Sequence, residues 1–224
     1  MAIPYFKLDP HGIVDDILKC ENIRKVKILE LEFQVFPGVY PSERFRTTDF
    51  LLTSLPPLKG KAVCDMGCGI GVVGIHSLLN KALSATFVDI NRIAVKNAEA
   101  NLQTHGLDGE VLRSNCFDSV PKQLFDVIVF NIPFHDDMVE IEVPLAYAFY
   151  DPSFKSVRKF LAQAKYYSHK ETEIIIAFSN KGNYELLEHL FDSYLYNWKL
   201  WKIINNESEF DNRLYLLKNN LGTI

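Results

Sequence analysis

Residues 62–74 read Ala-Val-Cys-Asp-Met-Gly-Cys-Gly-Ile-Gly-Val-Val-Gly, a short apolar run followed by a loop with glycine at positions 67, 69 and 71. The apolar run predicts a buried strand, and the residues from Val72 onward predict a helix. Closely spaced glycines let the chain turn sharply and bring backbone amides near a ligand at the helix N-terminus. The stretch therefore predicts a strand–loop–helix unit that holds an anionic or polar group.

The same alternation of strand and helix patterns continues on the C-terminal side of this loop. Short runs rich in Val, Ile and Phe predict strands at residues 62–66, 85–90, 111–114, 127–131 and 174–178. Apolar residues at helical spacing predict helices at residues 72–80, 91–105, 153–167 and 184–194. Regular alternation implies right-handed crossovers and an open parallel sheet covered on both faces.

Two final apolar segments, residues 200–204 and 214–217, are separated by polar residues and predict an antiparallel hairpin. The expected fold is thus α/β: a doubly wound, Rossmann-like, mostly parallel seven-stranded sheet with an antiparallel C-terminal hairpin. On the N-terminal side, residues 12–25 predict an amphipathic helix and residues 27–35 a strand. We expect residues 1–55 to form an extension packed on a catalytic domain of residues 56–224, where it covers the active site or shapes substrate choice.

Composition narrows the class of protein. The chain has 224 residues, 48% of them hydrophobic, which suits one large α/β domain. A formal net charge of -4 gives no long-range attraction to polyanions and argues against a dedicated nucleic-acid binder. The four cysteines lack the spacing of zinc sites or a disulfide framework, so we expect no metal. Without a signal-like or membrane-spanning apolar run, the sequence predicts a soluble cytoplasmic protein with no membrane partner.

Two acidic residues help to choose among possible cofactors. Residues 69–74 also satisfy the Gly-x-Gly-x-x-Gly pattern of dinucleotide-binding enzymes, which is weak evidence alone. Asp65 closes the strand before the glycines and favours a cationic, carboxylate-bearing cofactor, namely S-adenosylmethionine. Asp89 closes the second strand, where a carboxylate meets a ribose diol, and it is also placed to cap the next helix.

The fourth strand ends in Asn131-Ile132-Pro133-Phe134, which we call the acceptor motif. The Asn131 side-chain oxygen and the Ile132 carbonyl are suited to accept the two N–H bonds of an amide or amine. Proline makes the turn rigid, and the ring of Phe134 offers a plane for stacking. The motif predicts a site that positions a planar nitrogen.

The glycine loop, Asp89 and the acceptor motif, in this order, resemble the class I N-methyltransferases that carry an Asn-Pro-Pro-Tyr/Phe motif. The resemblance covers residues 32–218. Residues 32–39 and 46–49 are similar to the segment before the catalytic domain of HemK-type protein-glutamine N-methyltransferases, and this similarity implies that Thr48 and Asp49 line the cofactor pocket. The chain departs from the family pattern in two places. Ile132 replaces a proline, and Asn115 stands where an acidic residue usually meets adenine, with Asp118 as the alternative contact.

The resemblance implies an S-adenosylmethionine-dependent N-methyltransferase without metal or covalent intermediate, for which a protein glutamine is the favoured acceptor. Adenine in RNA or DNA and a small molecule are the alternative acceptors. An NAD-dependent oxidoreductase, or an inactive relative serving as an interaction module, are the alternatives from other classes. The predicted catalytic residues are Asn131, Ile132, Pro133 and Phe134. The predicted cofactor contacts are Thr48, Asp65, Gly67, Cys68, Gly69, Gly71, Asp89, Ile90, Asn115, Cys116 and Asn131.

Overall fold

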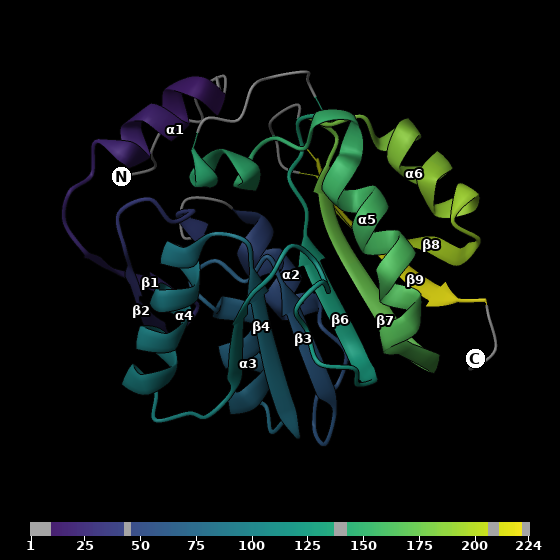
Figure 1. Ribbon diagram of the computed structural model, residues 1–224, viewed down its shortest axis with the longest axis horizontal. Helices are drawn as coiled ribbons and strands as arrows, with labels where there is room; N and C mark the ends of the chain where they lie inside the picture. Colours follow the sequence, from purple (N-terminus) through teal and green to yellow (C-terminus); the bar gives the residue numbers. More distant parts are fainter. Residues whose placement is uncertain (1–9, 43–45, 137–142, 206–210, 221–224) are drawn as a thin grey trace.

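The protein is described by a computed structural model for residues 10–42, 46–136, 143–205 and 211–220. A seven-stranded sheet with the order β5-β4-β3-β6-β7-β9-β8 forms its centre (Figure 1). The parallel strands are β3 (Ala62–Met66), β4 (Ser84–Asp89), β5 (Glu110–Arg113), β6 (Phe125–Asn131) and β7 (Ser168–Ser179). The antiparallel hairpin is β8 (Tyr196–Asn205) and β9 (Asp211–Asn219), which pairs with β7. The predicted fold class is confirmed.

Helices cover both faces of the sheet because the strands bury side chains on both sides. Along β7, for example, Ile175 packs into one core while Ile174 and Ile176 pack into the other. One face is covered by α2 (Arg46–Ser54), α3 (Val72–Leu79) and α4 (Arg92–Thr104). The opposite face is covered by α5 (Lys155–Ala164) and α6 (Tyr184–Ser193), as Figure 1 shows. Short 3-10 segments are η2 (Pro144–Ala148), η3 (Pro152–Phe154) and η4 (Lys165–Tyr167).

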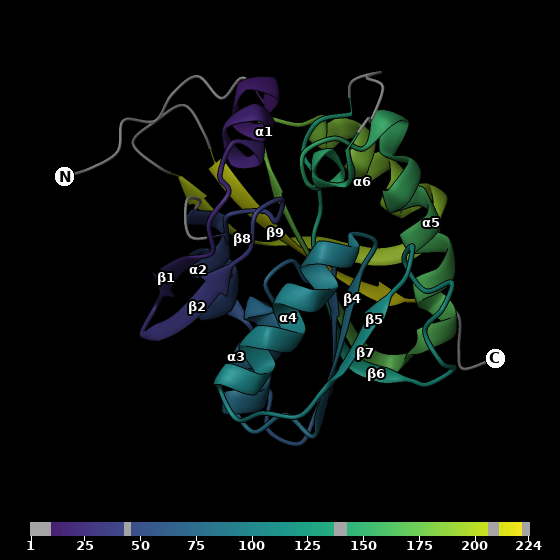
Figure 2. The same ribbon diagram turned by 60° about the vertical axis from the view of Figure 1, so that its left-hand side comes forward.

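The N-terminal part corrects two sequence-based predictions. The first helix, α1 (Pro10–Leu18), ends before Lys25, and the single strand expected at residues 27–35 is a hairpin of β1 (Arg24–Ile28) and β2 (Leu31–Val35) (Figure 2). The chain turns at Leu29, which has a φ of 50°. The apolar alternation changes phase at this point, from Val26 and Ile28 to Leu31, Phe33 and Val35, and the single-strand prediction overlooked this break.

Helix α5 begins later than predicted. Residues 153 and 154 have φ values of 55° and 52°, which belong to the left-handed region and not to a helix. The helix therefore starts at Lys155. The polar connection expected between the last two strands includes residues 206–210, which lie outside the described part of the chain.

The register of the sheet brings the predicted site residues to one edge. Met66 pairs with Val88 in β4 and with Phe130 in β6, so Gly67, Asp89 and Asn131 follow at the same level. Strand β3 lies between these two neighbours, and the strand order along the sheet reverses direction there. In open α/β sheets, ligands bind at such a reversal, outside the carboxyl ends of the strands. Within the residues described, we find no helix with the length and apolar character to cross a membrane.

Candidate active site

A pocket opens at this carboxyl edge, and most of the predicted site residues line it. The predicted residues in its wall are Thr48, Asp65, Gly67, Cys68, Gly69, Asp89, Ile90, Asn115, Cys116, Asn131 and Pro133. Three predicted residues, Gly71, Ile132 and Phe134, are not among the lining residues. Asp49 is not among them either and is exposed, although its neighbour Thr48 lines the pocket.

The glycine loop is held by hydrogen bonds from its own backbone to the strands beside it. The Gly69 amide donates to Asp89 Oδ2 at 2.9 Å, and the Cys68 amide donates to the Val88 carbonyl at 3.0 Å. At Gly67, where φ is +64°, a Cβ would lie 3.0 Å from the Phe130 ring, so the close approach also disfavours a side chain. The protein's own hydrogen bonds thus hold the loop between the two neighbouring strands.

Asp65 and Asp89 make the floor of the pocket acidic. Asp65 is 3% exposed, and burial raises its pKa to about 7, helped by the nearby Asp89, although the Gly74 amide opposes the shift with a 2.9 Å hydrogen bond. Burial also raises the pKa of Asp89. Because two desolvated carboxyl groups lie close together, a ligand that carries positive charge relieves the penalty for ionising them.

Asp89 does not cap α4. Its Oδ1 accepts the Asn91 amide at 2.8 Å and its Oδ2 accepts the Gly69 amide, while Asn91 itself is the N-cap and accepts the Ile93 amide at 2.9 Å. Each carboxylate oxygen of Asp89 retains lone-pair capacity beyond these bonds. The carboxylate is therefore oriented by the backbone and can still meet a hydroxyl group.

Part of the pocket wall comes from residues that the motifs did not identify. Val39, Tyr40 and Ser42 follow the β1–β2 hairpin and line the pocket, together with Leu145 and neighbouring residues of η2. Asn91 Nδ2 holds the start of the first segment by donating to the Gly38 carbonyl at 3.0 Å. Val39 ends the 32–39 segment of the HemK-type similarity, which assigned it no role, and the expectation that the N-terminal extension covers the site was the only signal for Tyr40 and Ser42.

The most informative atom in the pocket is the side-chain oxygen of Asn131. Asn131 ends β6 and lines the pocket, yet its Oδ1 is buried and accepts no hydrogen bond from the described part of the protein. Leaving a buried polar atom without a partner costs about 1–3 kcal/mol. A native protein accepts such a cost where a ligand supplies the missing donor.

The side chains of Ile132 and Phe134, which are not among the residues that line the pocket, pack within the protein. The Ile132 amide, which a proline would lack, donates to the Ala177 carbonyl of β7 at 3.3 Å, and its side chain is 2% exposed in the core. The Phe134 ring packs edge-on against Phe178, with 5.6 Å between centroids. A Cβ at position 182 would lie 2.1 Å from the Phe134 carbonyl oxygen, so Gly182 allows the loop after β7 to pack on the motif.

Asn115 and Asp118 have different surroundings. Asn115 lines the pocket, as does the neighbouring Cys116, whose φ of 52° turns the chain there. Asp118 instead forms an ion pair with Lys159 and accepts a 2.9 Å hydrogen bond from Gln163, both on α5. The Lys159 hydrogen bond is the main cause that lowers the pKa of Asp118. Of the two alternatives, Asn115 is among the residues that line the pocket and Asp118 is not.

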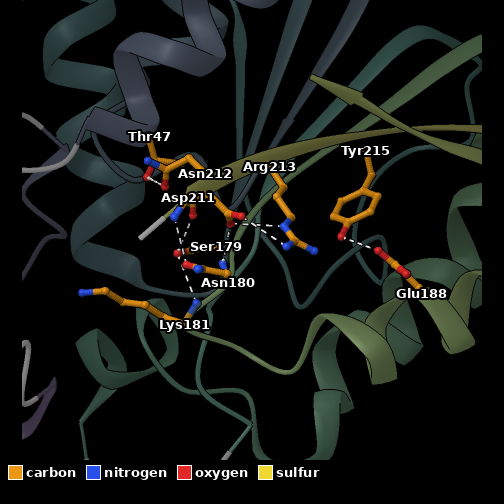
Figure 3. A network of polar contacts seen from close by, with 9 residues as sticks. All are labelled: Thr47, Ser179, Asn180, Lys181, Glu188, Asp211, Asn212, Arg213 and Tyr215. Atoms are coloured by element: carbon orange, nitrogen blue, oxygen red, sulfur yellow. Dashed lines mark hydrogen bonds and ion pairs between the residues drawn. The ribbon is translucent and has the colours of Figure 1, made fainter. Parts of the chain in front are cut away.

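A polar network at the carboxyl end of β7 joins three distant segments (Figure 3). Thr47 Oγ1 of α2 donates to Asn212 Oδ1 of β9 at 2.7 Å. Asn180 and Asp211 bond reciprocally, with the Asp211 amide donating to Asn180 Oδ1 at 3.0 Å. Arg213 pairs with Asp211 through two nitrogens, and its guanidinium lies 4.0 Å from the centroid of the Tyr184 ring. This network fixes the end of β7 and the start of β9 against α2.

Comparison with known proteins agrees with this architecture. A family model described as the methyltransferase small domain matches residues 30–196. A ribosomal RNA small subunit methyltransferase C from Vibrio vulnificus is 32% identical over 167 residues, which are 73% of this chain and 45% of that protein. The enzyme of the same name from Haemophilus influenzae (strain ATCC 51907) is 33% identical over 164 residues, 70% of this chain and 45% of that protein. The chain spans about half the length of the curated relatives it matches.

Solved structures show the same fold. A T. thermophilus 16S rRNA N2 methyltransferase, in complex with AdoMet and guanosine, superposes with a TM-score of 0.64 at 20% identity and covers 88% of this chain and 50% of its own. A ribosomal protein L11 methylase from Lactobacillus delbrueckii has a TM-score of 0.62 at 16% identity, covering 83% and 84%. The prediction of a class I methyltransferase domain is confirmed by these matches and the family model. The chain belongs to the methyltransferase small domain family.

Proposed function

We propose that this chain transfers a methyl group from S-adenosylmethionine to the exocyclic N2 amine of a guanine in small-subunit ribosomal RNA, in the cytoplasm. The observation that carries the proposal is the buried Oδ1 of Asn131, which lies in the pocket wall and accepts no hydrogen bond from the described residues. The similarity to the ribosomal RNA small subunit methyltransferases C supports the choice of acceptor. The acid-floored pocket and the glycine loop support the choice of cofactor.

The residues of the pocket suit the parts of this cofactor. Asp89 is oriented to accept hydroxyl groups of a ribose, and Asn115 to bond the edge of an adenine. Asp65 and the loop of Gly67 and Gly69 suit the charged amino-acid end. When bound, S-adenosylmethionine supplies an electrophilic methyl group on a sulfonium, whose sulfur keeps the electron pair of the broken bond. The negative floor of the pocket favours a cation there.

The acceptor motif would act by positioning. An exocyclic amine carries two N–H bonds, for which Asn131 Oδ1 and the Ile132 carbonyl are the proposed acceptors. Both hydrogen bonds would turn the nitrogen toward the methyl group and draw its protons away, which raises the electron density on the nitrogen and makes it a better nucleophile. The new N–C bond forms as one proton leaves to solvent. The rate enhancement comes from orientation and electrostatics, and Phe134 stays a predicted stacking partner.

The proposed methyl acceptor, a guanine, differs from the protein glutamine that the sequence analysis favours. The HemK-type similarity favours a protein glutamine, but the two sequence relatives named above are ribosomal RNA enzymes. A glutamine amide presents the same two N–H bonds, so it is the main competing acceptor. Adenine N6 and small amines compete on the same grounds. The division into an extension of residues 1–55 and a catalytic domain of residues 56–224 also stays a proposal.

A methyl-transfer assay with labelled S-adenosylmethionine tests the proposed function. The acceptors are small ribosomal subunits, purified small-subunit RNA, a glutamine-containing peptide and adenine-rich RNA, and the labelled nucleosides are identified by mass spectrometry. We expect N2-methylguanosine from ribosomal RNA or subunits, formed about 10²–10³-fold more slowly by Asn131→Ala. Label in the peptide would favour the glutamine alternative. If S-adenosylhomocysteine fails to bind the wild-type protein in calorimetric titration while NAD binds, the methyltransferase proposal is wrong.

A further inference from the structure

Two asparagines of α4, Asn97 and Asn101, are fully buried but lie outside the wall of the pocket. A buried amide that found no partner would be costly, so the partners of these side chains show what they are for. All of the hydrogen bonds that their side chains make are to backbone groups of distant segments. Their positions four residues apart place both on one face of the helix.

Together the two side chains hold strand β2 in the way a neighbouring strand would. The Gln34 amide donates to Asn101 Oδ1 at 2.8 Å, and the Phe36 amide donates to Asn97 Oδ1 at 2.7 Å. The Gln34 carbonyl accepts from both Nδ2 groups, at 2.8 Å from Asn97 and 2.9 Å from Asn101. The β1–β2 hairpin is thus docked on α4 through side-chain amides.

Asn101 makes one further contact that Asn97 does not. Its Nδ2 also donates to the Ile70 carbonyl, at 2.9 Å, within the glycine loop. The Ile70 carbonyl shares a planar peptide unit with the Gly71 amide, which donates to the Cys68 carbonyl at 2.8 Å. A hydrogen bond on that carbonyl therefore fixes the orientation of the whole peptide unit at the turn before α3.

We infer that Asn101 is a positioning residue for the cofactor: it orients the Ile70–Gly71 peptide and joins the glycine loop to the docked hairpin. The inference rests on the proposed function, because it assumes that the loop binds S-adenosylmethionine. Asn101 touches no part of the pocket, so its effect on affinity passes through the loop. Asn97, which holds the same hairpin without reaching the loop, provides the internal comparison.

Calorimetric titration with S-adenosylhomocysteine tests this role in three variants. We expect Asn101→Ala to raise Kd about tenfold and Asn97→Ala to raise it less than about threefold, since one hydrogen bond to the loop separates them. Thr104→Val is the matched control: it removes the exposed 3.1 Å bond between Gln34 Nε2 and Thr104 Oγ1, which joins the same two elements at the surface. We expect its Kd to equal that of the wild type.

Kinetics separate positioning from general loss of structure. For Asn101→Ala, KM for S-adenosylmethionine should rise in step with Kd, while kcat at saturating cofactor stays within about twofold. If alanine prevents folding, Asn101→Ser, whose shorter side chain cannot reach both carbonyls, is measured instead with the same expected order. Equal Kd values for the Asn97 and Asn101 variants would overturn the inference. Absence of S-adenosylhomocysteine binding by the wild type would overturn the proposed function as well.

Discussion

The cofactor side and the acceptor side of the pocket differ in how far the protein completes its own hydrogen bonds. On the cofactor side, the Gly69 amide, the Ile70 carbonyl and the Gly71 amide each have a partner within the protein. On the acceptor side, Asn131 Oδ1 is buried and has no donor among the described residues. The difference supports the proposal that the protein organises the cofactor side itself and that the acceptor nitrogen completes the other side.

The largest expected effect comes from removing Asn131 Oδ1, the buried oxygen that has no donor among the described residues. Asn131→Ala should lower kcat by about 10²–10³-fold, the range seen when one transition-state hydrogen-bonding group is lost. If Asn131 serves the acceptor alone, the Kd for S-adenosylhomocysteine should change by less than about threefold, and a larger rise would support its predicted second role as a cofactor contact. Single-turnover methyl transfer and calorimetry measure the two quantities. A parallel loss of cofactor affinity and turnover would break the distinction between the two sides.

On the cofactor side, the ionisation of Asp65 predicts that cofactor affinity depends on pH. With a folded-state pKa of about 7, Asp65 is protonated in acid and charged above neutrality. A cationic cofactor prefers the charged form, so affinity for S-adenosylmethionine should rise as pH increases from 6 to 8, by up to about tenfold per pH unit below the pKa. Calorimetry across this range measures the slope, and Asp65→Asn should bind more weakly and without this slope.

The raised pKa of Asp65 also predicts that the stability of the folded protein falls as pH rises, whereas cofactor affinity rises. Because the folded pKa of Asp65 lies above the unfolded value near 3.8, its contribution to stability is full below that value and is lost as pH rises through about 7. Without cofactor, Asp65→Asn should therefore be more stable than the wild type at pH 8, by roughly 2–4 kcal/mol. Denaturant unfolding at pH 5 and pH 8 tests this; equal differences at both pH values would contradict it.

A smaller effect is expected at the residue where the acceptor motif departs from the family. Ile132→Pro removes the amide that donates to Ala177 and empties part of a packed site, so the free energy of unfolding should fall by about 1–2 kcal/mol. We expect kcat to change less than about fivefold, since the Ile132 carbonyl is retained. Chemical denaturation and the methyl-transfer assay provide both values. A stabilised variant would show that the β7 hydrogen bond is unimportant.

The smallest effect concerns the network shown in Figure 3. Thr47→Val keeps the shape of the side chain but leaves Asn212 Oδ1 without this donor, which should cost about 1 kcal/mol of stability. Thr53→Val on the same helix is the control, because its hydroxyl bonds only to exposed carbonyls of α2. Thermal unfolding of both variants decides the matter, and an equal change in Tm would assign no special role to the network. Cofactor affinity should be unaffected in either.

The strands, the helices and the residues that directly follow strands could be predicted from short continuous stretches of sequence. The apolar runs and helical spacings around residues 62–66 and 91–105 predict the sheet and its helices. The glycine loop, Asp89 and Asn131 follow three strands directly, and parallel strands bring such positions to one edge. These residues could be placed in one pocket without coordinates because local pattern and sheet topology suffice.

Contacts between side chains that are distant in the sequence became known from the three-dimensional structure. Asn101 accepts a hydrogen bond from the Gln34 amide, 67 residues away in the sequence. Asp118 interacts with Lys159 and Gln163 on α5. The apolar alternation changes phase at Leu29 without showing that the chain reverses there, and Tyr40 lines the pocket although no motif marks it. A buried amide or carboxylate takes its partner from whatever the fold brings within hydrogen-bond distance, and a one-dimensional pattern of residue types does not contain that distance.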